Sequence, residues 1–372
     1  MCIRNYAKMK KISVDLGDNS YNIHIGKRFF PEFNFKQFNK SKYAIITDSF
    51  INDDIIGPGY SKILKNRLDE QGLESKIFSF EYGEESKIPE TAIELGRKLA
   101  RNKFDRNSMI IALGGGVVGD MAGWLASFYL RGIDYIQIPT TLIAQADSSI
   151  GGKTGVDIPE GKNLFGAFYQ PQAVIIDTYL LSSLGKEKIM NGLGEVIKYG
   201  VTLDKNLFNY LEGNIKNFVR DDIFLDYVVR KCCKIKASVV EKDEKEGEYR
   251  KVLNYGHTIG HAIEVAENYK IMHGDCVSLG MLYEGKLANE LGFFSDEDLE
   301  RQNKIIDHFS FMPSYNYKLD IDKILKFMKR DKKSKSEEIY FVFPIEIGRV
   351  REENGKVAFP LDEKIIRKFL KD

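Results

Sequence analysis

The chain has 372 residues, 43% of them hydrophobic and 29% charged, and its 55 lysines and arginines nearly balance 54 aspartates and glutamates. A net charge of +1 excludes the strong single-sign field that would favour nucleic acid or a membrane as the main partner. The length predicts about two to three domains, and the four cysteines do not form a disulfide framework. Neither a signal peptide nor an apolar run of about eighteen residues is visible, so we expect a soluble, cytoplasmic protein.

The first half of the chain alternates short apolar runs with amphipathic stretches. The apolar runs predict strands over residues 42–47, 76–81, 108–113, 135–138 and 173–176, and the amphipathic stretches predict helices over 61–71 and 89–102. Strands that alternate with helices in this way are typical of a parallel sheet with helices on both faces. We therefore predict an α/β fold whose N-terminal lobe is a Rossmann-like parallel sheet.

The pattern changes after about residue 178, where helical periodicity dominates. It predicts helices over residues 191–201, 221–242, 258–268 and 277–291, and only the segment near 339–343 has the pattern of a strand. The charged stretch 241–251 predicts a solvated loop. We predict two domains, an α/β domain over residues 1–180 and a mainly helical domain over residues 181–372.

A glycine-rich motif follows the predicted strand at 108–113. Residues Gly114 to Gly119 match the pattern G-x-G-x-x-G between a strand and a helix, which lets backbone N–H groups approach a pyrophosphate. Asp134 lies at the distance of the acid that contacts a ribose in such folds. The motif ends the third predicted strand, however, whereas it normally ends the first. We favour dinucleotide binding through the glycines over a merely tight turn, and we discount Asp134.

A second glycine-rich stretch spans residues 147–157. Its Gly152-Lys153-Thr154 run suggests a P-loop, but a P-loop needs glycine at position 147, which is Asp147. The stretch is therefore predicted to be a loop whose glycines, lysine and aspartates suit anions and hydroxyl groups. Further basic residues lie within or beside glycine-rich or histidine-rich stretches and would suit a substrate with phosphate and carboxylate groups, although scattered basic residues are normally solvated. They are Lys162, Lys198, Arg250, Lys332 and Lys333.

Three of the chain's five histidines are clustered. His257 and His261 are four residues apart, which places both rings on one helical face, and His273 follows closely. This clustering favours a metal site over ordinary packed histidines. A carboxylate is the usual third ligand of a catalytic zinc, and Glu195 between glycines is a candidate, although it could be an ordinary helix-surface acid. Cys276 could also bind metal, but a cysteine is more often a small buried apolar residue.

Four long stretches together resemble the 3-dehydroquinate synthase family. They cover residues 139–157, 161–171, 194–200 and 253–264, and the similarity extends from about residue 43 to the Ile347-Gly348 region. The resemblance implies an NAD-binding α/β lobe and a mainly helical lobe that binds metal and substrate. It also implies conversion of the sugar phosphate 3-deoxy-D-arabino-heptulosonate 7-phosphate to 3-dehydroquinate and phosphate, with NAD oxidising the substrate transiently and a divalent metal, zinc or cobalt, acting as Lewis acid.

The resemblance assigns individual roles and corrects the spacing argument. It places the metal ligands at Glu195, His257 and His273, and it places His261 near the substrate phosphate. It implies a homodimer, because Arg131 matches a residue that reaches into the neighbouring subunit's site.

The remaining roles that the resemblance implies fall into two groups. The NAD-binding positions are Asp48, Tyr82, Gly83, Glu84, Glu85, Ser86, Lys87, Gly115, Gly116, Val117, Asp120, Thr140, Thr141, Asp147, Lys153 and Lys162. The catalytic and substrate positions are Lys153, Lys162, Asn163, Lys198, Lys236, Glu246, Arg250, Asn254, His261 and one of Lys332 and Lys333, with Asp147 also matching a substrate-side group.

Three alternatives stay open at the level of sequence. Another sugar-phosphate cyclase would share the fold and the metal site and would differ in its substrate pocket. A metal-dependent polyol dehydrogenase would release NADH in proportion to product. A catalytically inactive paralogue would keep the fold alone, although the intact metal and lysine positions disfavour it.

Overall fold

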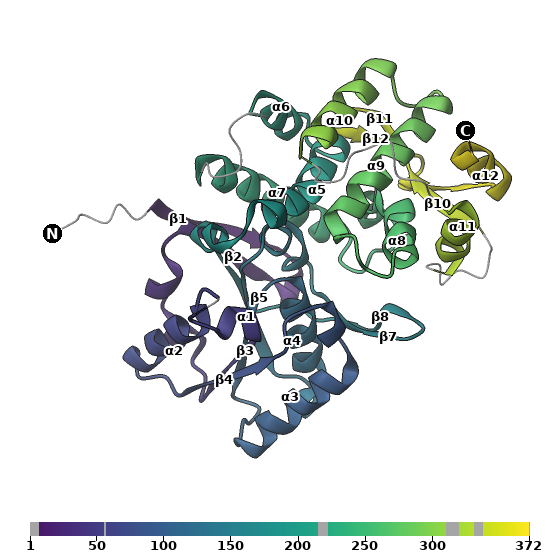
Figure 1. Cartoon of the computed structure of the whole chain (residues 1–372). Helices are drawn as coiled ribbons and strands as arrows, with labels where there is room; N and C mark the ends of the chain where they lie inside the picture. The colour runs from purple at the N-terminus through teal and green to yellow at the C-terminus, as the bar shows by residue number, and fades with distance from the viewer. Residues whose placement is uncertain (1–6, 56, 215–221, 310–319, 331–337, 372) are drawn as a thin grey trace. The chain divides into compact units, whose positions relative to one another are not determined.

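A computed structural model describes residues 7–55, 57–214, 222–309, 320–330 and 338–371. The chain divides into two compact units, drawn together in Figure 1. Unit 1 comprises Met1–Leu184 and Leu225–Ala237, and unit 2 comprises Gly185–Phe224 and Ser238–Asp372. Helix α7 (Asp222–Lys242) therefore contributes to both units, although it lies after the predicted boundary near residue 180. The assignment of separate functions to residues 1–180 and 181–372 stays a prediction.

Unit 1 is built on a seven-stranded sheet with the order β1-β2-β9-β6-β5-β3-β4. Its strands are β1 (Ala7–Val14), β2 (Tyr21–Lys27), β3 (Tyr43–Asp48), β4 (Ser75–Phe80), β5 (Met109–Gly114), β6 (Asp134–Pro139) and β9 (Ala173–Asp177). Only the pairing of β1 with β2 is antiparallel, and the other neighbours in this sheet run parallel. The α/β fold with a mostly parallel sheet is confirmed, and the five predicted strands are present.

The helices of unit 1 cover both faces of this sheet. Besides part of α7, they are α1 (Ser49–Asn52), α2 (Tyr60–Glu70), α3 (Pro89–Arg101) and α4 (Gly116–Phe128), with short 3-10 turns at 17–19, 30–32, 35–38, 84–86, 129–131 and 178–183. Side chains of β5 alternate between two separate hydrophobic clusters. Ile110 packs with α3 and α4, whereas Ile111 packs with α2. Because both faces are buried, the strand reads as a continuous apolar run in the sequence.

The first two strands were not predicted. β1 carries the lysines at positions 8, 10 and 11, which have the composition of a charged, solvated segment. It lies at the edge of the sheet, where lysines are tolerated and discourage pairing with other chains. β2 pairs with β9, which comes last of the seven strands along the chain. Tertiary pairing and not a local sequence pattern therefore stabilises the hairpin of β1 and β2.

The predicted glycine-rich loop at 147–157 is only partly a loop. A π-helical turn (Ala144–Ser148) includes its first two residues, and from Lys153 onward the chain forms strand β7 (Lys153–Ile158), which pairs with β8 (Gly161–Phe168). The prediction was wrong for this second half. Gly155 lies opposite Gly166 in the hairpin, and a Cβ on Gly155 would stand 3.3 Å from the Cα of Gly166. Small residues there reflect close backbone approach and not a loop.

Unit 2 is mainly helical, as predicted. Besides the two ends of α7, its helices are α5 (Lys186–Thr202), α6 (Lys205–Gly213), α8 (His257–Ala266), α9 (His273–Glu290), α10 (Asp296–Phe309), α11 (Ile321–Arg330) and α12 (Glu363–Lys371). Strands β10 (Ile339–Val342) and β13 (Ala358–Leu361) pair, as do β11 (Pro344–Glu346) and β12 (Arg349–Val350). The predicted strand near 339–343 is confirmed as β10, but the expectation that it is the only strand there was wrong, because β11, β12 and β13 are too short to carry an alternating pattern of their own.

The charged stretch 241–251 is not a solvated loop throughout. Helix α7 continues to Lys242, and a 3-10 helix (Tyr249–Asn254) begins within the stretch. Asp243 accepts hydrogen bonds from the backbone N–H groups of Gly247, Glu248 and Arg250 at 2.8 to 3.0 Å. This carboxylate folds the turn back and carries the Arg250 side chain into a buried position.

Helices α5, α8 and α9 approach one another at glycines. A Cβ placed on Gly274 of α9 would lie 1.8 Å from the carbonyl oxygen of Asn191 on α5. A Cβ placed on Gly280 of α9 would lie 1.9 Å from the carbonyl oxygen of Gly256, which precedes α8. No side chain larger than hydrogen fits at either contact, so these glycines set the spacing of the three helices.

We predict that Gly274→Ala destabilises the protein, because the added methyl group must push α5 and α9 apart. The free energy of unfolding should fall by about 1 to 3 kcal/mol, the usual effect of overpacking. Chemical denaturation checks this. Gly213→Ala is the control, because a Cβ there would meet no atom within 4 Å, and an equal loss in both variants would contradict the contact argument.

Candidate metal and nucleotide sites

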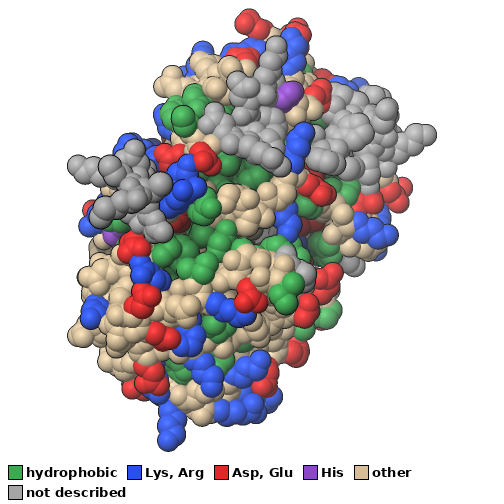
Figure 2. Space-filling model, turned by 60° about the vertical axis from the view of Figure 1, so that its left-hand side comes forward, with side chains coloured by type: hydrophobic (Ala, Val, Ile, Leu, Met, Phe, Trp, Pro, Cys, Tyr) green, Lys and Arg blue, Asp and Glu red, His purple; other side chains and the backbone are tan. Residues whose placement is uncertain are grey.

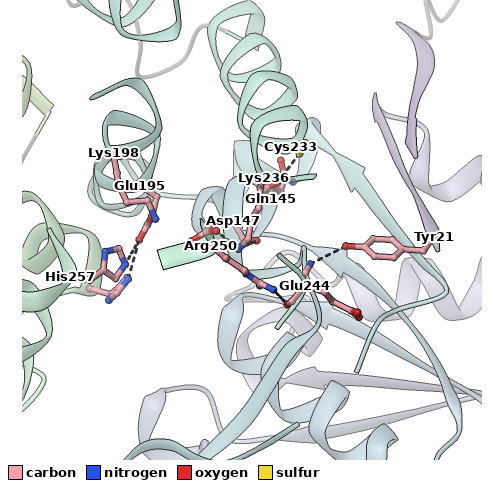
Figure 3. Close-up of polar contacts among 12 residues, drawn as sticks. Tyr21, Gln145, Asp147, Glu195, Lys198, Cys233, Lys236, Glu244, Arg250 and His257 are labelled. Carbon is pink, nitrogen blue, oxygen red and sulfur yellow. Dashed lines mark hydrogen bonds and ion pairs between the residues drawn. The ribbon is translucent and has the colours of Figure 1, made fainter. Parts of the chain in front are cut away.

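In unit 2, Glu195 faces two imidazole rings from neighbouring helices. Glu195 lies on α5 with 0% exposure, and its Oε1 is 3.1 Å from Nε2 of His257 and 3.2 Å from Nε2 of His273. Figure 3 shows the Glu195 side chain pointing toward His257. His261 also belongs to this cluster, since one ring nitrogen from each of the three histidines lies within 4.8 Å of the others. The structure thus brings all four predicted residues together.

Lys198 completes the surroundings of Glu195. It lies one helical turn further along α5, is 1% exposed, and forms an ion pair with the other carboxylate oxygen, Oε2. Burial opposes the charge of Glu195, but Lys198 and His257 outweigh it and hold the pKa of Glu195 well below its usual range. Glu195 is therefore an ionised carboxylate, the form that a divalent metal requires.

A hydrogen-bond acceptor lies behind each imidazole. Nδ1 of His257 is 3.1 Å from the carbonyl oxygen of Tyr255, and Nδ1 of His273 is 3.5 Å from Oε2 of Glu264. Acceptors in these places favour an Nδ1–H on each ring and leave Nε2 to face Glu195 and a metal. Two imidazole nitrogens and a carboxylate oxygen form a donor set that suits zinc or cobalt. Sequence reasoning missed both acceptors, since neither belongs to a recognisable spacing.

The two rings differ in their affinity for protons. Burial, only partly offset by Glu195, lowers the pKa of His257 to about 4. Burial acts in the same direction on His273, but hydrogen bonds to Glu195 and Glu264 outweigh it and raise the pKa of His273 to about 10. At neutral pH the His257 ring is thus a neutral imidazole, and the His273 ring is a positively charged imidazolium.

The other predicted residues of unit 2 lie in the turn before α8. The Asn254 side-chain amide donates to Oε1 of Glu246 at 3.3 Å, and the Arg250 guanidinium donates to the carbonyl oxygen of Glu244 at 2.5 Å. Glu246 adopts a left-handed backbone conformation (φ 59°), which is uncommon for a non-glycine residue and accompanies functional turns. Lys332 and Lys333 lie outside the described residues.

In unit 1, the structure pairs two predicted residues from different elements. Lys236 of α7 forms an ion pair with the Asp147 carboxylate and donates to the Asp147 carbonyl oxygen at 2.8 Å. Asp147 lies on the π-helical turn, a distortion that is frequent at functional sites. One turn of α7 earlier, the buried Cys233 thiol contacts the carbonyl oxygen of Gln145 at 3.2 Å, and Figure 3 shows both contacts. Burial raises the pKa of Cys233, which keeps this thiol inert.

The loop that follows the π-helical turn is tied to the N-terminal hairpin. The Gly151 N–H donates to the Tyr21 hydroxyl at 2.9 Å. Gly151 and Gly152 have positive φ angles of 92° and 65°, so the chain can turn sharply just before Lys153 at the start of β7. Lys153 itself is exposed. The unpredicted strand β2 thereby supports a predicted functional loop.

The glycine motif occupies the turn that the sequence predicts. β5 ends at Gly114, and α4 begins at Gly116. The backbone N–H of Thr140 donates to the Gly114 carbonyl at 2.9 Å, and the Thr141 side chain lies against Gly115. A Cβ on Gly115 would stand 3.1 Å from Cγ2 of that threonine, a tight contact that glycine avoids.

The position of this turn within the sheet explains why the glycine motif follows the third predicted strand and not the first. β3 is followed by β4 on one side, whereas β5 and then β6 lie on the other, so the strand order reverses between β3 and β5. Asp48 ends β3 and Gly115 follows β5, so both flank this reversal at the carboxyl edge of the sheet. Ligands of open α/β sheets bind at such a point. The reversal of strand order, and not the rank of the strand along the chain, marks the point where a ligand binds.

Asp134 lies at the opposite edge of the sheet. It pairs in register with Met109 at the start of β5, whereas Pro139 pairs with Gly114 at the end. Its carboxylate forms an ion pair with Lys40. The separation of about five residues along a strand, roughly 17 Å, places it out of reach of the glycine turn. Discounting Asp134 is consistent with this geometry.

The predicted run from Tyr82 to Lys87 joins the same region. Lys87 is 4% exposed and forms an ion pair of 2.8 Å with Asp120 in the first turns of α4. Burial opposes the charge of Lys87, but Asp120, Glu84 and Asp157 outweigh it and raise the pKa of Lys87. Nζ of Lys162, on β8, lies 3.2 Å from Oε1 of Glu84. Together these contacts bring four predicted nucleotide-side residues beside α4.

Asp157 belongs to the stretch that the sequence predicts to suit anions and hydroxyl groups, but it received no individual role there. Its carboxylate accepts the Asn163 backbone N–H at 2.7 Å, and its own N–H donates to the Lys87 carbonyl at 2.7 Å. Asn163 needs this support because it has a left-handed backbone conformation (φ 52°). Asp157 therefore links the tip of the hairpin β7–β8 to the segment that carries Lys87.

The comparisons with known proteins agree on one family. Residues 77–191 match the description "3-dehydroquinate synthase N-terminal", and residues 192–334 match "3-dehydroquinate synthase C-terminal". The chain is 42% identical to a 3-dehydroquinate synthase from Dictyoglomus thermophilum, over 98% of each chain. The chain belongs to the 3-dehydroquinate synthase family. A 3-dehydroquinate synthase from Thermodesulfovibrio yellowstonii is 40% identical, over 98% of this chain and 100% of the other.

A solved structure of a 2-deoxy-scyllo-inosose synthase is also similar to this member of the family. It was determined in complex with carbaglucose-6-phosphate, NAD⁺ and Co²⁺. It is 26% identical, has a TM-score of 0.87, and covers 97% of this chain and 99% of its own. The family relationship and this likeness confirm the predicted fold class, an N-terminal Rossmann-like lobe followed by a mainly helical lobe.

Figure 2 shows Lys and Arg side chains interspersed with Asp and Glu over the face that it presents, as the net charge of +1 predicts. Within the described ranges, no helix combines the length and apolarity needed to cross a membrane.

We predict that zinc uptake at pH 7.5 releases about one proton per subunit, because His273 must lose its proton to coordinate a metal. Its raised pKa means that the proton is held below about pH 10, so zinc affinity should rise with pH from neutrality to about 10. Calorimetric titration of chelator-treated protein in two buffers of different ionisation enthalpy measures this release. The control is His308→Asn, at an exposed histidine on α10, which should release as many protons as the wild type. Binding heats that do not depend on the buffer would contradict the assignment of His273 as a charged ligand.

Proposed function

We propose that this member of the 3-dehydroquinate synthase family converts 3-deoxy-D-arabino-heptulosonate 7-phosphate to 3-dehydroquinate and phosphate, and that it is a lyase. The observation that carries this proposal is the cluster of Glu195, Lys198, His257 and His273 in a chain 42% identical to a named synthase over nearly its whole length. The cluster combines a metal donor set with a buried cation, which suits a hydroxylated, anionic substrate.

We assign NAD to the carboxyl edge of the unit 1 sheet. The glycine turn at 114–116 offers backbone N–H groups at the start of α4, and Asp48 stands at the end of the adjacent strand. The related inosose synthase was solved with NAD⁺ and Co²⁺, which supports both cofactors here. When bound, NAD accepts and returns a hydride, and a divalent metal polarises substrate oxygens. The net reaction consumes no NAD.

The protein's own residues hold and orient the substrate in this proposal. Lys198, Lys236 and Arg250 are buried cations that can receive carboxylate and phosphate oxygens. Glu195 holds His257 and His273 in one cluster, so the metal site has a fixed geometry before any substrate arrives. His261 supplies a further ring nitrogen beside that cluster, which can form a hydrogen bond to the phosphate group of the substrate.

Another sugar-phosphate cyclase is the second candidate, because the related structure is an inosose synthase complexed with a sugar-phosphate analogue. The experiment that decides is an assay with the heptulosonate phosphate and less NAD than substrate, in which phosphate and NADH are both measured. We expect many phosphates released per NAD. Net accumulation of NADH would indicate a dehydrogenase, and phosphate release only from a hexose phosphate would indicate the alternative cyclase.

We predict that His261→Ala keeps about one zinc per subunit and slows phosphate release about a hundredfold to ten-thousandfold, the range for loss of a proton-transfer or hydrogen-bonding group. His273→Ala should instead lose zinc after chelation and dialysis. Metal content and turnover are measured on the same samples. Loss of zinc from the His261 variant would place that ring in the coordination sphere, which its distance from the other two allows.

We also propose that the protein is a homodimer. The hairpin β7–β8 is labelled in Figure 1. Its Leu164, Phe165 and Phe168 side chains are 40 to 49% exposed, and further exposed apolar side chains occur at the end of α4, which contacts that hairpin. Solvent-exposed phenylalanines of this kind are typical of surfaces that a partner covers. Arg131 follows α4 in a left-handed conformation (φ 67°), a strained arrangement that suits a positioned functional residue.

We predict that mixed dimers of two inactive variants regain activity. If Arg131 serves the neighbouring site, a dimer of Arg131→Ala and Lys198→Ala subunits has one intact site and one site with both changes. Random mixing should then restore about a quarter of wild-type activity per subunit. The assay follows turnover in an equal mixture whose mixed dimers are verified, and two Lys198→Ala preparations serve as control. Inactive mixed dimers would show that Arg131 serves its own subunit.

A further inference from the structure

A buried carboxylate caps the helix that carries His257. Glu284 of α9 has 0% exposure, and its two oxygens accept the backbone N–H groups of Gly256 at 2.8 Å and Ile259 at 3.0 Å. These N–H groups belong to the N-cap and third positions of α8. A helix usually satisfies them with its own side chains, through a capping box. Glycine and isoleucine have no acceptor, so Glu284 supplies both bonds from another helix.

The same peptide unit that Glu284 holds also contacts His257. The Gly256 N–H and the Tyr255 carbonyl belong to one planar amide and point in opposite directions. The Tyr255 carbonyl oxygen lies 3.1 Å from Nδ1 of His257. A continuous chain therefore runs from the Glu284 carboxylate through the amide to the ring, whose Nε2 lies 3.1 Å from Glu195.

We propose that Glu284 is a positioning residue for His257 and acts through the peptide between Tyr255 and Gly256. The inference rests on the proposed role of His257 as a metal ligand. A negative charge that accepts the amide N–H polarises the amide and makes its carbonyl a stronger acceptor. The carbonyl then holds the proton on Nδ1, which leaves the Nε2 lone pair for a metal.

The residues on either side of this amide are closely packed. The Tyr255 hydroxyl donates to Oε1 of Gln302 at 2.7 Å in a buried position. Gly256 has a left-handed conformation (φ 77°), and a Cβ there would stand 2.6 Å from Cγ of Met281. His273 differs, because its Nδ1 faces the Glu264 carboxylate directly at 3.5 Å. Each proposed histidine ligand thus has a carboxylate behind it, one direct and one relayed.

The first test compares zinc affinities by competition with a chelator. Glu284→Gln keeps the size of the side chain but removes the charge and places an NH₂ group against one of the two N–H donors. We expect about a tenfold to hundredfold loss of zinc affinity, the typical effect of removing a partner behind a ligand. Glu290→Gln is the matched control, because Glu290 lies on the same helix and makes only an exposed contact of 3.6 Å with Lys286 among the contacts described. It should bind zinc as the wild type does.

The second test observes the Nδ1–H proton of His257 directly by NMR of the zinc-loaded protein. The wild type should show a hydrogen-bonded Nδ1–H, and Glu284→Gln should weaken it. Tyr255→Phe removes the hydroxyl's hydrogen bonds to Gln302 and to the Met281 carbonyl but keeps the backbone amide, so it should lower the thermal stability and leave the Nδ1–H signal in place. This contrast separates positioning of the ring from general support of the core.

The outcomes separate the relay from the proposed function. If the wild type binds no zinc, the metal site itself fails. If the wild type binds zinc and Glu284→Gln binds it equally tightly with an unchanged Nδ1–H signal, only the relay fails. If Glu284→Gln does not fold, the wild-type spectrum still decides, because a zinc-loaded protein without a hydrogen-bonded Nδ1–H on His257 would overturn the relay.

Discussion

The charge of Glu195 is the constraint on which unit 2 depends. A carboxylate with no exposed surface is costly unless cations or hydrogen-bond donors surround it. Lys198 comes from the same helix, but the two imidazoles come from α8 and α9, so three helices must meet at one point. A glycine adjoins each converging residue in the sequence, at Gly194, Gly256 and Gly274, and each of these glycines lies where a Cβ would strike a neighbouring backbone. The buried charge of Glu195 requires the three helices to meet, and the lack of a Cβ at the three glycines lets them approach closely enough.

Unit 1 obeys a different constraint, which is the direction of its strands. Parallel strands bring their carboxyl ends to one edge, and the reversal of strand order between β3 and β5 opens a place there for a ligand. Lys87 then shows how distant segments are held at that edge. Its side chain pairs with Asp120 of α4, and its carbonyl binds the N–H of Asp157 in β7. The hairpin, the helix and the loop after β4 are therefore fixed by contacts to a single lysine.

The sequence predicts the features that local pattern determines. Strands such as β5 are apolar throughout because both faces are buried, and His257 and His261 share a helical face because of their spacing. It does not predict β1, whose lysines suit an edge strand only once β2 lies beside β9. It also misses Glu284 and Asp157, since their partners are backbone N–H groups that tertiary packing brings close. A site residue that binds the backbone leaves no spacing pattern, so only the fold can reveal it.

The cations proposed for the substrate are already paired in the protein. Lys198 binds Glu195, Lys236 binds Asp147, and Arg250 donates to a backbone carbonyl. A buried, unpaired cation would be unstable, so these pairs allow the charges to persist in a protein of net charge +1. An anionic substrate must therefore replace or share an existing partner of each cation that it contacts. Monovalent anions gain little from such an exchange, whereas a ligand that carries both a phosphate and a carboxylate satisfies several cations at once. Selectivity for a multiply charged substrate then follows from the pairing itself.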